Sequence, residues 1–211
     1  MDSLAMKPED IERESFRIID DEAGDHGWPD DEWQIVRRAI HTSADFEYSR
    51  SLVLSDDVIK KAVTAIRNGA GIVTDTNMAL SGISKARLRP FGCDVSCHVA
   101  DPDVAEFAAR EGITRSIAAM RKAVEDRNNR IFVIGNAPTA LFELLRLIET
   151  GKVEPAVIIG LPVGFVGAEE SKNALASEKH DIPFITNIGR KGGSNVAAAV
   201  VNALAILASE N

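Results

Sequence analysis

The sequence predicts an α/β fold built on a parallel sheet. From residue 70 onward, short runs rich in Ile and Val alternate with segments long enough to be helices. The runs show little polar alternation, which is typical of parallel strands that are buried on both faces. Before residue 70 the apolar spacing is helical instead. We therefore expect an N-terminal helical extension followed by a doubly wound, five-stranded parallel sheet.

The N-terminal extension is expected to contain three helices after a loose leader at residues 1–7. Pro8 suits the first turn of the first helix. The second helix has an acidic first turn that complements the helix dipole, and its apolar stripe lies within residues 33–40. The third helix is predicted to start at Ser55, a residue type that caps helices, and to end at Gly69.

Five strands and the helices that connect them are predicted in the rest of the chain. The strands are expected at 71–75, 93–99, 130–135, 156–160 and 183–188. The helices are expected at 105–111, 115–128, 139–151, 167–177 and 194–209, and their crossovers should be right-handed. Because sheets of this kind bind ligands outside the carboxyl ends of their strands, we expect the chemistry in the loops that follow the strands.

Composition narrows the classes of function. The 211 residues are expected to form a single domain with a sizeable core, and the net charge of −8 disfavours a nucleic-acid partner. Cys93 and Cys97 are the only cysteines and lack zinc or redox spacing, and the four histidines lack metal-site spacing, so no metal is expected. No apolar stretch approaches ~18 residues and the N-terminus is polar, so we expect a cytoplasmic protein without a membrane span.

Two loops that follow predicted strands carry unusual residues. At 135–139, Gly135 permits close backbone approach, and Asn136 either caps the next helix or binds a ligand. At 160–172, glycines alternate with apolar side chains, but the spacing is not that of a phosphate-binding loop. This stretch is suited to a wall against a flat apolar ring. A simple structural turn remains the alternative interpretation of both loops.

Cations gather at two further helix starts. The loop 189–195 carries Arg190 and Lys191 among glycines just before a helix, and helix N-termini favour anions. Arg115 begins another helix and can bind a carboxylate through two hydrogen bonds. Either loop could equally be a solvated basic turn. Four such features at one edge of the sheet favour a ligand with several anionic groups.

His41 is a candidate general acid. It follows the apolar stripe of the second helix, and a helix C-terminus favours the protonated imidazole. A general acid needs to hold a proton at the working pH and to release it. A histidine at the end of a helix is also a common cap, so its position alone leaves both roles open.

Several longer motifs resemble the precorrin-8X methylmutase (precorrin isomerase) family of cobalamin biosynthesis. The resemblance covers residues 8–205. Its motifs are Glu14-Ser15-Phe16, Ile40-His41-Thr42, Gly135-Asn136-Ala137-Pro138-Thr139-Ala140-Leu141, Gly160-Leu161-Pro162-Val163-Gly164-Phe165-Val166, Glu170-Ser171-Lys172 and Gly189-Arg190-Lys191-Gly192-Gly193-Ser194. The resemblance implies a flavodoxin-like fold and a homodimer.

The resemblance also implies a reaction. It is an isomerisation that moves a methyl group from C-11 to C-12 of precorrin-8X, or of cobalt-precorrin-8. The product is the corrin hydrogenobyrinic acid, or cobyrinic acid when cobalt is present. The shift occurs within one tetrapyrrole (porphyrin-related) molecule, so no methyl donor, redox partner or other cofactor is expected. His41 is then the catalytic acid, Ser15 touches the substrate and Arg115 binds it.

Further substrate contacts are expected from the motif residues Asn136, Thr139, Lys172 and Arg190. Two other classes of function stay open: a corrinoid carrier without catalysis, and a flavin or nucleotide protein of the same fold. The absence of phosphate-loop spacing argues against the flavin or nucleotide protein. Ser15 and His41 lie in the helical extension, so we also expect a pocket shared across the dimer.

Overall fold

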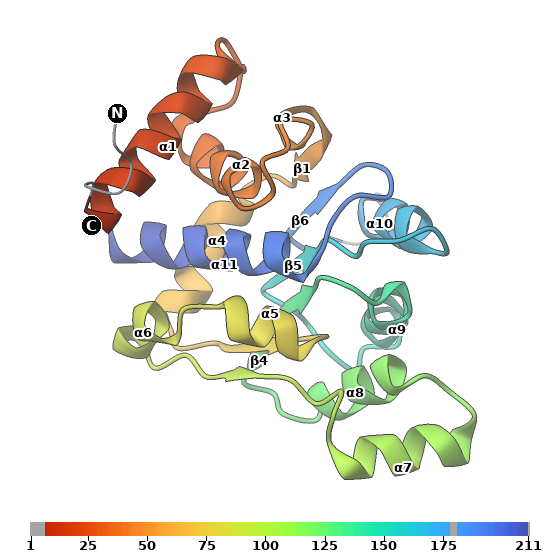
Figure 1. Ribbon diagram of the computed structural model, residues 1–211. Coiled ribbons are helices and arrows are strands. Elements are labelled where there is room, and N and C mark those ends of the chain that lie inside the picture. The colour runs from red at the N-terminus through yellow and green to blue at the C-terminus, as the bar shows by residue number, and fades with distance from the viewer. Residues whose placement is uncertain (1–6, 178–180, 211) are drawn as a thin grey trace.

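A computed structural model describes residues 7–177 and 181–210. In this part of the chain a single sheet of six strands runs in the order β1-β6-β5-β4-β2-β3 (Figure 1). The strands are β1 (Leu52–Leu54), β2 (Gly71–Thr74), β3 (Val95–Ser96), β4 (Asn129–Ile134), β5 (Val157–Gly160) and β6 (Phe184–Asn187). Strands β2 to β6 are parallel, and β1 pairs antiparallel with β6. The prediction of an α/β fold with a mostly parallel sheet is confirmed.

The predicted number of strands was wrong. Strand β1 lies between α3 and α4 in the segment that we expected to be wholly helical, and it brings the sheet in the described residues to six strands. It is only three residues long, too short for a strand period to be visible in the sequence. Its structure comes from pairing with β6, with Leu52 opposite Asn187 and Leu54 opposite Ile185.

The edge strand β3 is shorter than predicted. Of the expected segment 93–99, only Val95 and Ser96 pair with β2, opposite Ile72 and Val73. Gly92 turns the chain in the left-handed region just before the strand, and a reverse turn closes by a hydrogen bond from the Asp101 N–H to the His98 carbonyl just after it. Turns on both sides therefore limit the strand.

Helices precede, connect and cover the strands. They are α1 (Pro8–Ala23), α2 (Asp30–Ser43), α3 (Tyr48–Ser51), α4 (Val58–Arg67), α5 (Asn77–Gly82), α6 (Lys85–Leu88), the 3₁₀ turn η2 (Arg89–Phe91), α7 (Pro102–Glu111), α8 (Arg115–Ala123), α9 (Pro138–Glu149), α10 (Ala168–Leu175) and α11 (Ser194–Ser209). The leader expected at residues 1–7 falls mostly outside the described residues. Helices α5 and α6 were not expected from the sequence. No described helix is long and apolar enough to cross a membrane.

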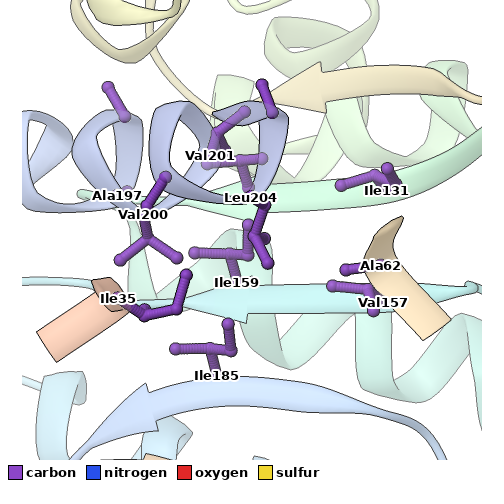
Figure 2. Close-up of a cluster of buried hydrophobic side chains, with 14 of the residues drawn as sticks. Ile35, Ala62, Ile131, Val157, Ile159, Ile185, Ala197, Val200, Val201 and Leu204 are labelled. Carbon is purple, nitrogen blue, oxygen red and sulfur yellow. The ribbon is translucent and has the colours of Figure 1, made fainter. Parts of the chain in front are cut away.

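The sheet is covered by helices on both faces. Alternate strand residues, such as Ile159 and Ile185, join one core with α2, α4 and α11, as Figure 2 shows. Their neighbours along the strands, such as Phe132 and Ile158, join a second core with α9 and α10. Each fully buried Val, Leu or Ile side chain contributes about 1.5–3 kcal/mol. These two cores fix the sheet and leave the loops at the carboxyl ends of the parallel strands on one edge.

Candidate active site

A buried carboxylate organises the loop after β4. Asp75, directly after β2, is 1% exposed and accepts hydrogen bonds from the N–H groups of Gly135, Asn136 and Ala137 at 2.8, 2.9 and 2.7 Å. Burial raises the pKa of the Asp75 carboxyl, and the three N–H groups oppose that shift. Asp75 therefore ties the ends of β2 and β4 together and shapes the start of α9.

The same edge brings in the N-terminus of α11. The hydroxyls of Thr76 and Ser194 lie 2.7 Å apart. Gly135 fits against this helix start because a Cβ there would come within 2.7 Å of the Ser194 Cα. The expected close backbone approach at Gly135 is thus made to α11, and it packs the loop after β4 against the loop after β6.

The loops after β5 and β6 are also joined. The N–H of Gly193 donates to the Leu161 carbonyl at 2.9 Å, and the N–H of Gly164 donates to the Arg190 carbonyl at 3.1 Å. Gly192, at φ 154°, lies so close to Leu161 that a Cβ would come within 2.2 Å of its carbonyl oxygen. A side chain at position 192 would separate the two loops, so this glycine is needed for packing.

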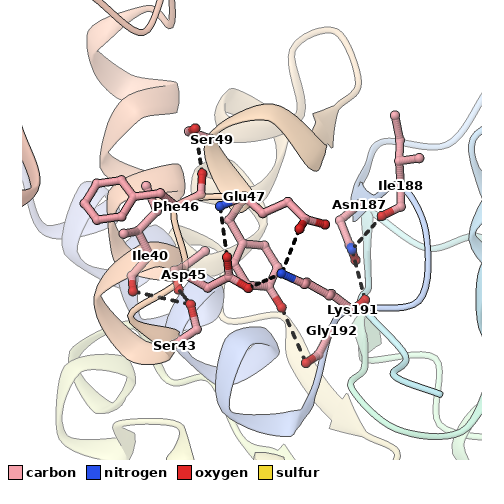
Figure 3. Close-up of polar contacts among 12 residues, drawn as sticks. Ile40, Ser43, Asp45, Phe46, Glu47, Ser49, Asn187, Ile188, Lys191 and Gly192 are labelled. Atoms are coloured by element: carbon pink, nitrogen blue, oxygen red, sulfur yellow. Dashed lines mark hydrogen bonds and ion pairs between the residues drawn. The ribbon is translucent and has the colours of Figure 1, made fainter. Parts of the chain in front are cut away.

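His41 lies in the last turn of α2 and is exposed in the described chain. The helix was expected to end near Ile40, but it continues to Ser43 and closes at Ala44, whose N–H donates to the Ile40 carbonyl at 2.7 Å. The His41 ring meets the edge of the Phe16 ring at 5.1 Å between centroids. Figure 3 shows this end of α2 beside the loop that follows β6.

Helix α1 supplies the other side of the His41 environment. The guanidinium groups of Arg37 and Arg38 lie 4.4 and 4.7 Å from the centre of the Phe16 ring. Ser15 is half-buried next to Phe16, and its hydroxyl donates to the Ile11 carbonyl at 2.8 Å. Ser15 and His41 are therefore brought to neighbouring helices, with Phe16 between α1 and the end of α2.

Exposed polar residues mark the α8–α9 side of the edge. Thr114 caps α8, accepting from the Ile117 N–H at 3.2 Å, and its hydroxyl lies 3.4 Å from that of Thr139. Arg115 follows Thr114 directly, so the helix starts that carry Arg115 and Thr139 adjoin. Arg115, Thr139 and Asn136 are all exposed, as a ligand contact requires.

An apolar surface flanks Arg190. Phe165 and Val166 are 86% and 88% exposed, and Ile188 is 60% exposed. The Arg190 guanidinium lies 5.7 Å from the centre of the Phe165 ring, and its Nε is 4.0 Å from a Glu169 oxygen. A cation beside exposed apolar side chains is suited to a ligand that has both a flat ring and carboxylates.

Lys172 occupies a different position from the other predicted substrate contacts. Its side chain is buried, 1% exposed, and its ammonium donates to the Lys191 carbonyl at 2.6 Å and to the Asn187 side-chain oxygen at 3.2 Å. A buried polar group needs such partners, and these are supplied by the protein. Lys172 therefore holds the loop after β6 from inside, which differs from the expected direct contact with substrate.

The buried ammonium predicts a pH dependence. Burial lowers the pKa of Lys172 from 10.5 to about 8. Between pH 8 and 10.5 the unfolded chain therefore binds more protons at this site, so the folded state gains stability as pH rises through that window. We expect the free energy of unfolding of the unchanged protein to rise relative to that of Lys172→Met, by at most ~1.4 kcal/mol per pH unit.

Urea unfolding at several pH values from 7 to 11 measures this difference. Lys60→Met is the matched control because Lys60 is exposed on α4, so its difference from the unchanged protein should not vary with pH. A pH-independent difference for Lys172→Met as well would show that the Lys172 ammonium is not desolvated in the folded protein.

A large groove lies away from these loops. Its volume is about 670 Å³, and it lies between α4 and the segments that precede β4, β5 and β6. Lys60, Arg127 and Pro155 are among its lining residues, and none of the residues expected at the site is. Asn136, Thr139 and Arg190 lie instead in or just after the loops at the carboxyl ends of the strands, whereas Ser15 lies on α1 and His41 at the end of α2.

Sequence reasoning missed two residues of this edge. Asp75 was assigned only to a strand, although an acidic residue at the end of a buried apolar run was an available signal. Lys191 was taken as part of an anion site, but its ammonium lies 2.5 Å from Asp45 and 2.8 Å from Glu47. Those acids are distant in sequence, so only the fold reveals the pairing.

Comparison with known proteins agrees with the motifs. Residues 10–207 match the family model described as precorrin-8X methylmutase. The chain is 49% identical over 205 residues to a cobalt-precorrin-8 methylmutase of Priestia megaterium, covering 97% of this chain and 90% of that protein. It is 42% identical over 195 residues to a precorrin-8X methylmutase of a Sinorhizobium species, covering 92% of each.

A solved structure agrees in fold as well. The crystal structure of precorrin-8x methyl mutase from Thermus thermophilus matches with a TM-score of 0.87 at 41% identity, over 96% of this chain and 97% of that one. The family resemblance seen in the motifs is thereby confirmed. From its sequence and its fold, the chain belongs to the precorrin-8X methylmutase family.

Proposed function

We propose that this protein is an isomerase of cobalamin biosynthesis. It moves a methyl group from C-11 to C-12 of precorrin-8X or of cobalt-precorrin-8 and forms hydrogenobyrinic acid or cobyrinic acid. The observation that carries the proposal is the exposed His41 beside the loops of the carboxyl edge, in a chain that matches the family over residues 10–207. The names of the relatives reported above give no support to the carrier alternative.

His41 acts as the proton donor. Its imidazole protonates a nitrogen of the macrocycle, which makes the ring more electron-poor and lowers the barrier to migration of the methyl group. The methyl carbon breaks its bond to C-11 and forms a bond to C-12 of the same molecule, and the ring nitrogen then returns its proton to the imidazole, so no other reactant takes part. One positioned acid contributes about 10²–10⁴-fold, and the geometry of binding supplies the rest.

Binding uses the exposed cations and the apolar surface. Arg115 and Arg190 bind the acetate and propionate carboxylates at the rim of the macrocycle, and Arg can do so through two hydrogen bonds. Phe165 and Val166 cover a face of the ring. Ser15, Asn136 and Thr139 add hydrogen bonds around it. Lys172 contributes indirectly, by fixing the loop that carries Arg190.

The architecture has a flavodoxin-like core in a single domain. The parallel strands β3-β2-β4-β5-β6 follow the order 2-1-3-4-5 when they are numbered along the chain, and this order supports the assignment. In such sheets the ligand lies at the carboxyl edge, where the loops described above converge. The scarcity of cysteine supports a cytoplasmic location.

The functional unit is a homodimer whose pocket is shared between subunits. On one chain the loops at the carboxyl edge leave Phe165 and Val166 86% and 88% exposed. Large apolar side chains at the surface are typical of binding sites and interfaces. Ser15 and His41 lie in the helical extension, and in the proposed dimer this extension contributes them to the sheet edge of the partner.

Mixing two inactive variants tests the shared pocket. We expect His41→Ala and Arg115→Ala, denatured together and refolded, to recover part of the activity, because a mixed dimer then holds one intact site. Each variant refolded alone is the control and should stay inactive. If the mixture is as inactive as its parents although mixed dimers form, each site belongs to one chain.

Absorbance spectroscopy tests the activity. The purified protein is incubated with precorrin-8X and, separately, with cobalt-precorrin-8. Conversion to the corrin spectrum supports the isomerase, and the substrate that is converted faster shows whether cobalt is inserted before this step. A bound macrocycle that stays unconverted in both incubations would contradict the proposal and indicate a carrier.

A further inference from the structure

Lys191 has two anchors, one for its backbone and one for its side chain. The Lys191 carbonyl accepts hydrogen bonds from the buried Lys172 ammonium at 2.6 Å and from the Asn187 amide at 2.9 Å. Its ammonium reaches the other way, to Asp45 at 2.5 Å and Glu47 at 2.8 Å (Figure 3). One residue thus links the interior of the sheet edge to the segment that follows α2.

The ammonium of Lys191 binds Asp45 and Glu47, which follow the helix that contains His41. Helix α2 ends at Ser43, and Asp45 follows two residues later, where it also accepts the Glu47 N–H at 3.0 Å. The hydrogen bond to Lys191 lowers the pKa of Asp45, so the pair is charged at neutral pH. The residue before Asp45, Ala44, donates its N–H to the Ile40 carbonyl at 2.7 Å, which joins Asp45 closely to the last turn of α2, in which His41 lies.

Other ties between these segments are weaker. The Asn195 amide lies 3.5 Å from the Thr42 carbonyl, and the Tyr48 hydroxyl lies 3.5 Å from the Gly192 carbonyl. Both distances are at the limit of a hydrogen bond. Of these contacts between residues 42–48 and 191–195, the charged pairs of Lys191 are therefore the strong ones.

We propose that Lys191 is a positioning residue for His41. Its ammonium fixes the C-terminal end of α2 against the loop after β6, and Lys172 and Asn187 hold that loop in place. Lys191 differs in this respect from its neighbour Arg190, whose exposed guanidinium lies beside Phe165 and Glu169 on the surface proposed to bind the ligand. The inference rests on the proposed catalytic role of His41.

We call the ion pairs of Lys191 with Asp45 and Glu47 the clamp. The clamp should affect the rate of turnover much more than the stability of the fold. Lys191, Asp45 and Glu47 are 44%, 30% and 55% exposed, and exposed ion pairs add little to folding free energy. A displacement of about 1 Å of a catalytic group, in contrast, can cost roughly 10²-fold in rate. Loss of a residue that acts only in stability would instead lower the stability of the fold and leave the rate of turnover nearly unchanged.

Kinetics of three variants test the inference. Lys191→Met removes the ammonium and keeps an unbranched side chain one atom shorter, Lys191→Arg keeps the charge, and Lys60→Met is an exposed control. We expect Lys191→Met to lower kcat about tenfold, with KM within about twofold and Tm nearly unchanged. Lys191→Arg should restore most of kcat, and Lys60→Met should behave as the unchanged protein.

A double substitution of the acidic partners of Lys191 allows a mutant cycle, which measures whether the two sides of the clamp act together. Asp45→Asn with Glu47→Gln should reproduce the loss of Lys191→Met, and the combination of all three should lose no more. A rise in KM with kcat unchanged would instead show that Lys191 contacts the substrate. Equal kcat and KM for Lys191→Met and the unchanged protein would also overturn the inference.

NMR of the His41 imidazole separates this inference from the proposed function. We expect Lys191→Met, but not Lys60→Met, to shift the ring signals of His41 in the protein without substrate. This readout does not require turnover. If the unchanged protein proves inactive while the His41 signals shift, the proposed function fails and the clamp stands. Unshifted signals in an active protein would overturn the clamp alone.

Discussion

Replacement of His41 by Ala is expected to lower turnover by about 10²–10⁴-fold, the range that one general acid contributes. The folded structure should tolerate the change, because His41 is exposed and its ring packs edge-to-face with Phe16. Exposed substitutions of this kind usually change stability by less than about 0.5 kcal/mol. Affinity for the corrin product should remain near that of the unchanged protein, since Arg115 and Arg190 are untouched.

His41→Asn separates proton transfer from hydrogen bonding. Asn can donate a hydrogen bond but cannot transfer a proton to the ring, so it should be as slow as Ala. Single-turnover rates and equilibrium titration with product measure the two effects. If Asn keeps most of the activity, His41 only orients the macrocycle. Rates for both variants equal to that of the unchanged protein would remove His41 from the mechanism.

Asp75→Ala is expected to destabilise the fold by roughly 3 kcal/mol, because it leaves two buried N–H groups and one part-buried N–H group without their acceptor. The damage falls on the loop that carries Asn136 and on the start of α9. Any protein that remains folded should therefore bind substrate more weakly. Urea unfolding followed by circular dichroism measures the stability, and product titration measures the binding.

Asp75→Asn provides the matched comparison. An amide has one acceptor oxygen, so it can keep the hydrogen bonds from Asn136 and Ala137 while its NH₂ group opposes the Gly135 N–H. Its loss should be smaller than that of Ala. Asp94→Ala, at an exposed position, is the control and should be neutral. A loss for Asp75→Ala no larger than for Asp94→Ala would mean that the loop does not depend on this carboxylate.

Sequence reasoning succeeded for two features of the fold: the buried parallel strands and the common edge on which their following loops lie. The segments that form β4, β5 and β6 are short, continuous and apolar. Such segments are typical of parallel strands that are buried on both faces. Their following loops then had to share an edge, so the grouping of Asn136, Arg190 and the 160–167 stretch followed from topology alone.

The same reasoning could not find features that depend on tertiary contact. Strand β1 has three residues and exists because β6 is beside it, which no local pattern records. In the sequence, nothing distinguishes Lys172 and Lys191 from lysines at the surface. Burial of the first and the pairing of the second with Asp45 and Glu47 arise only when α10, β6 and the end of α2 come together.

The proposed reaction moves one methyl group within one molecule. The most direct test is substrate labelled with ¹³C at the C-11 methyl, mixed with an unlabelled substrate of distinguishable mass and followed by NMR and mass spectrometry. We predict that the label appears at C-12 of the product and stays in the molecules that carried it. A label that remains at C-11, or that passes to the other substrate, would contradict the account.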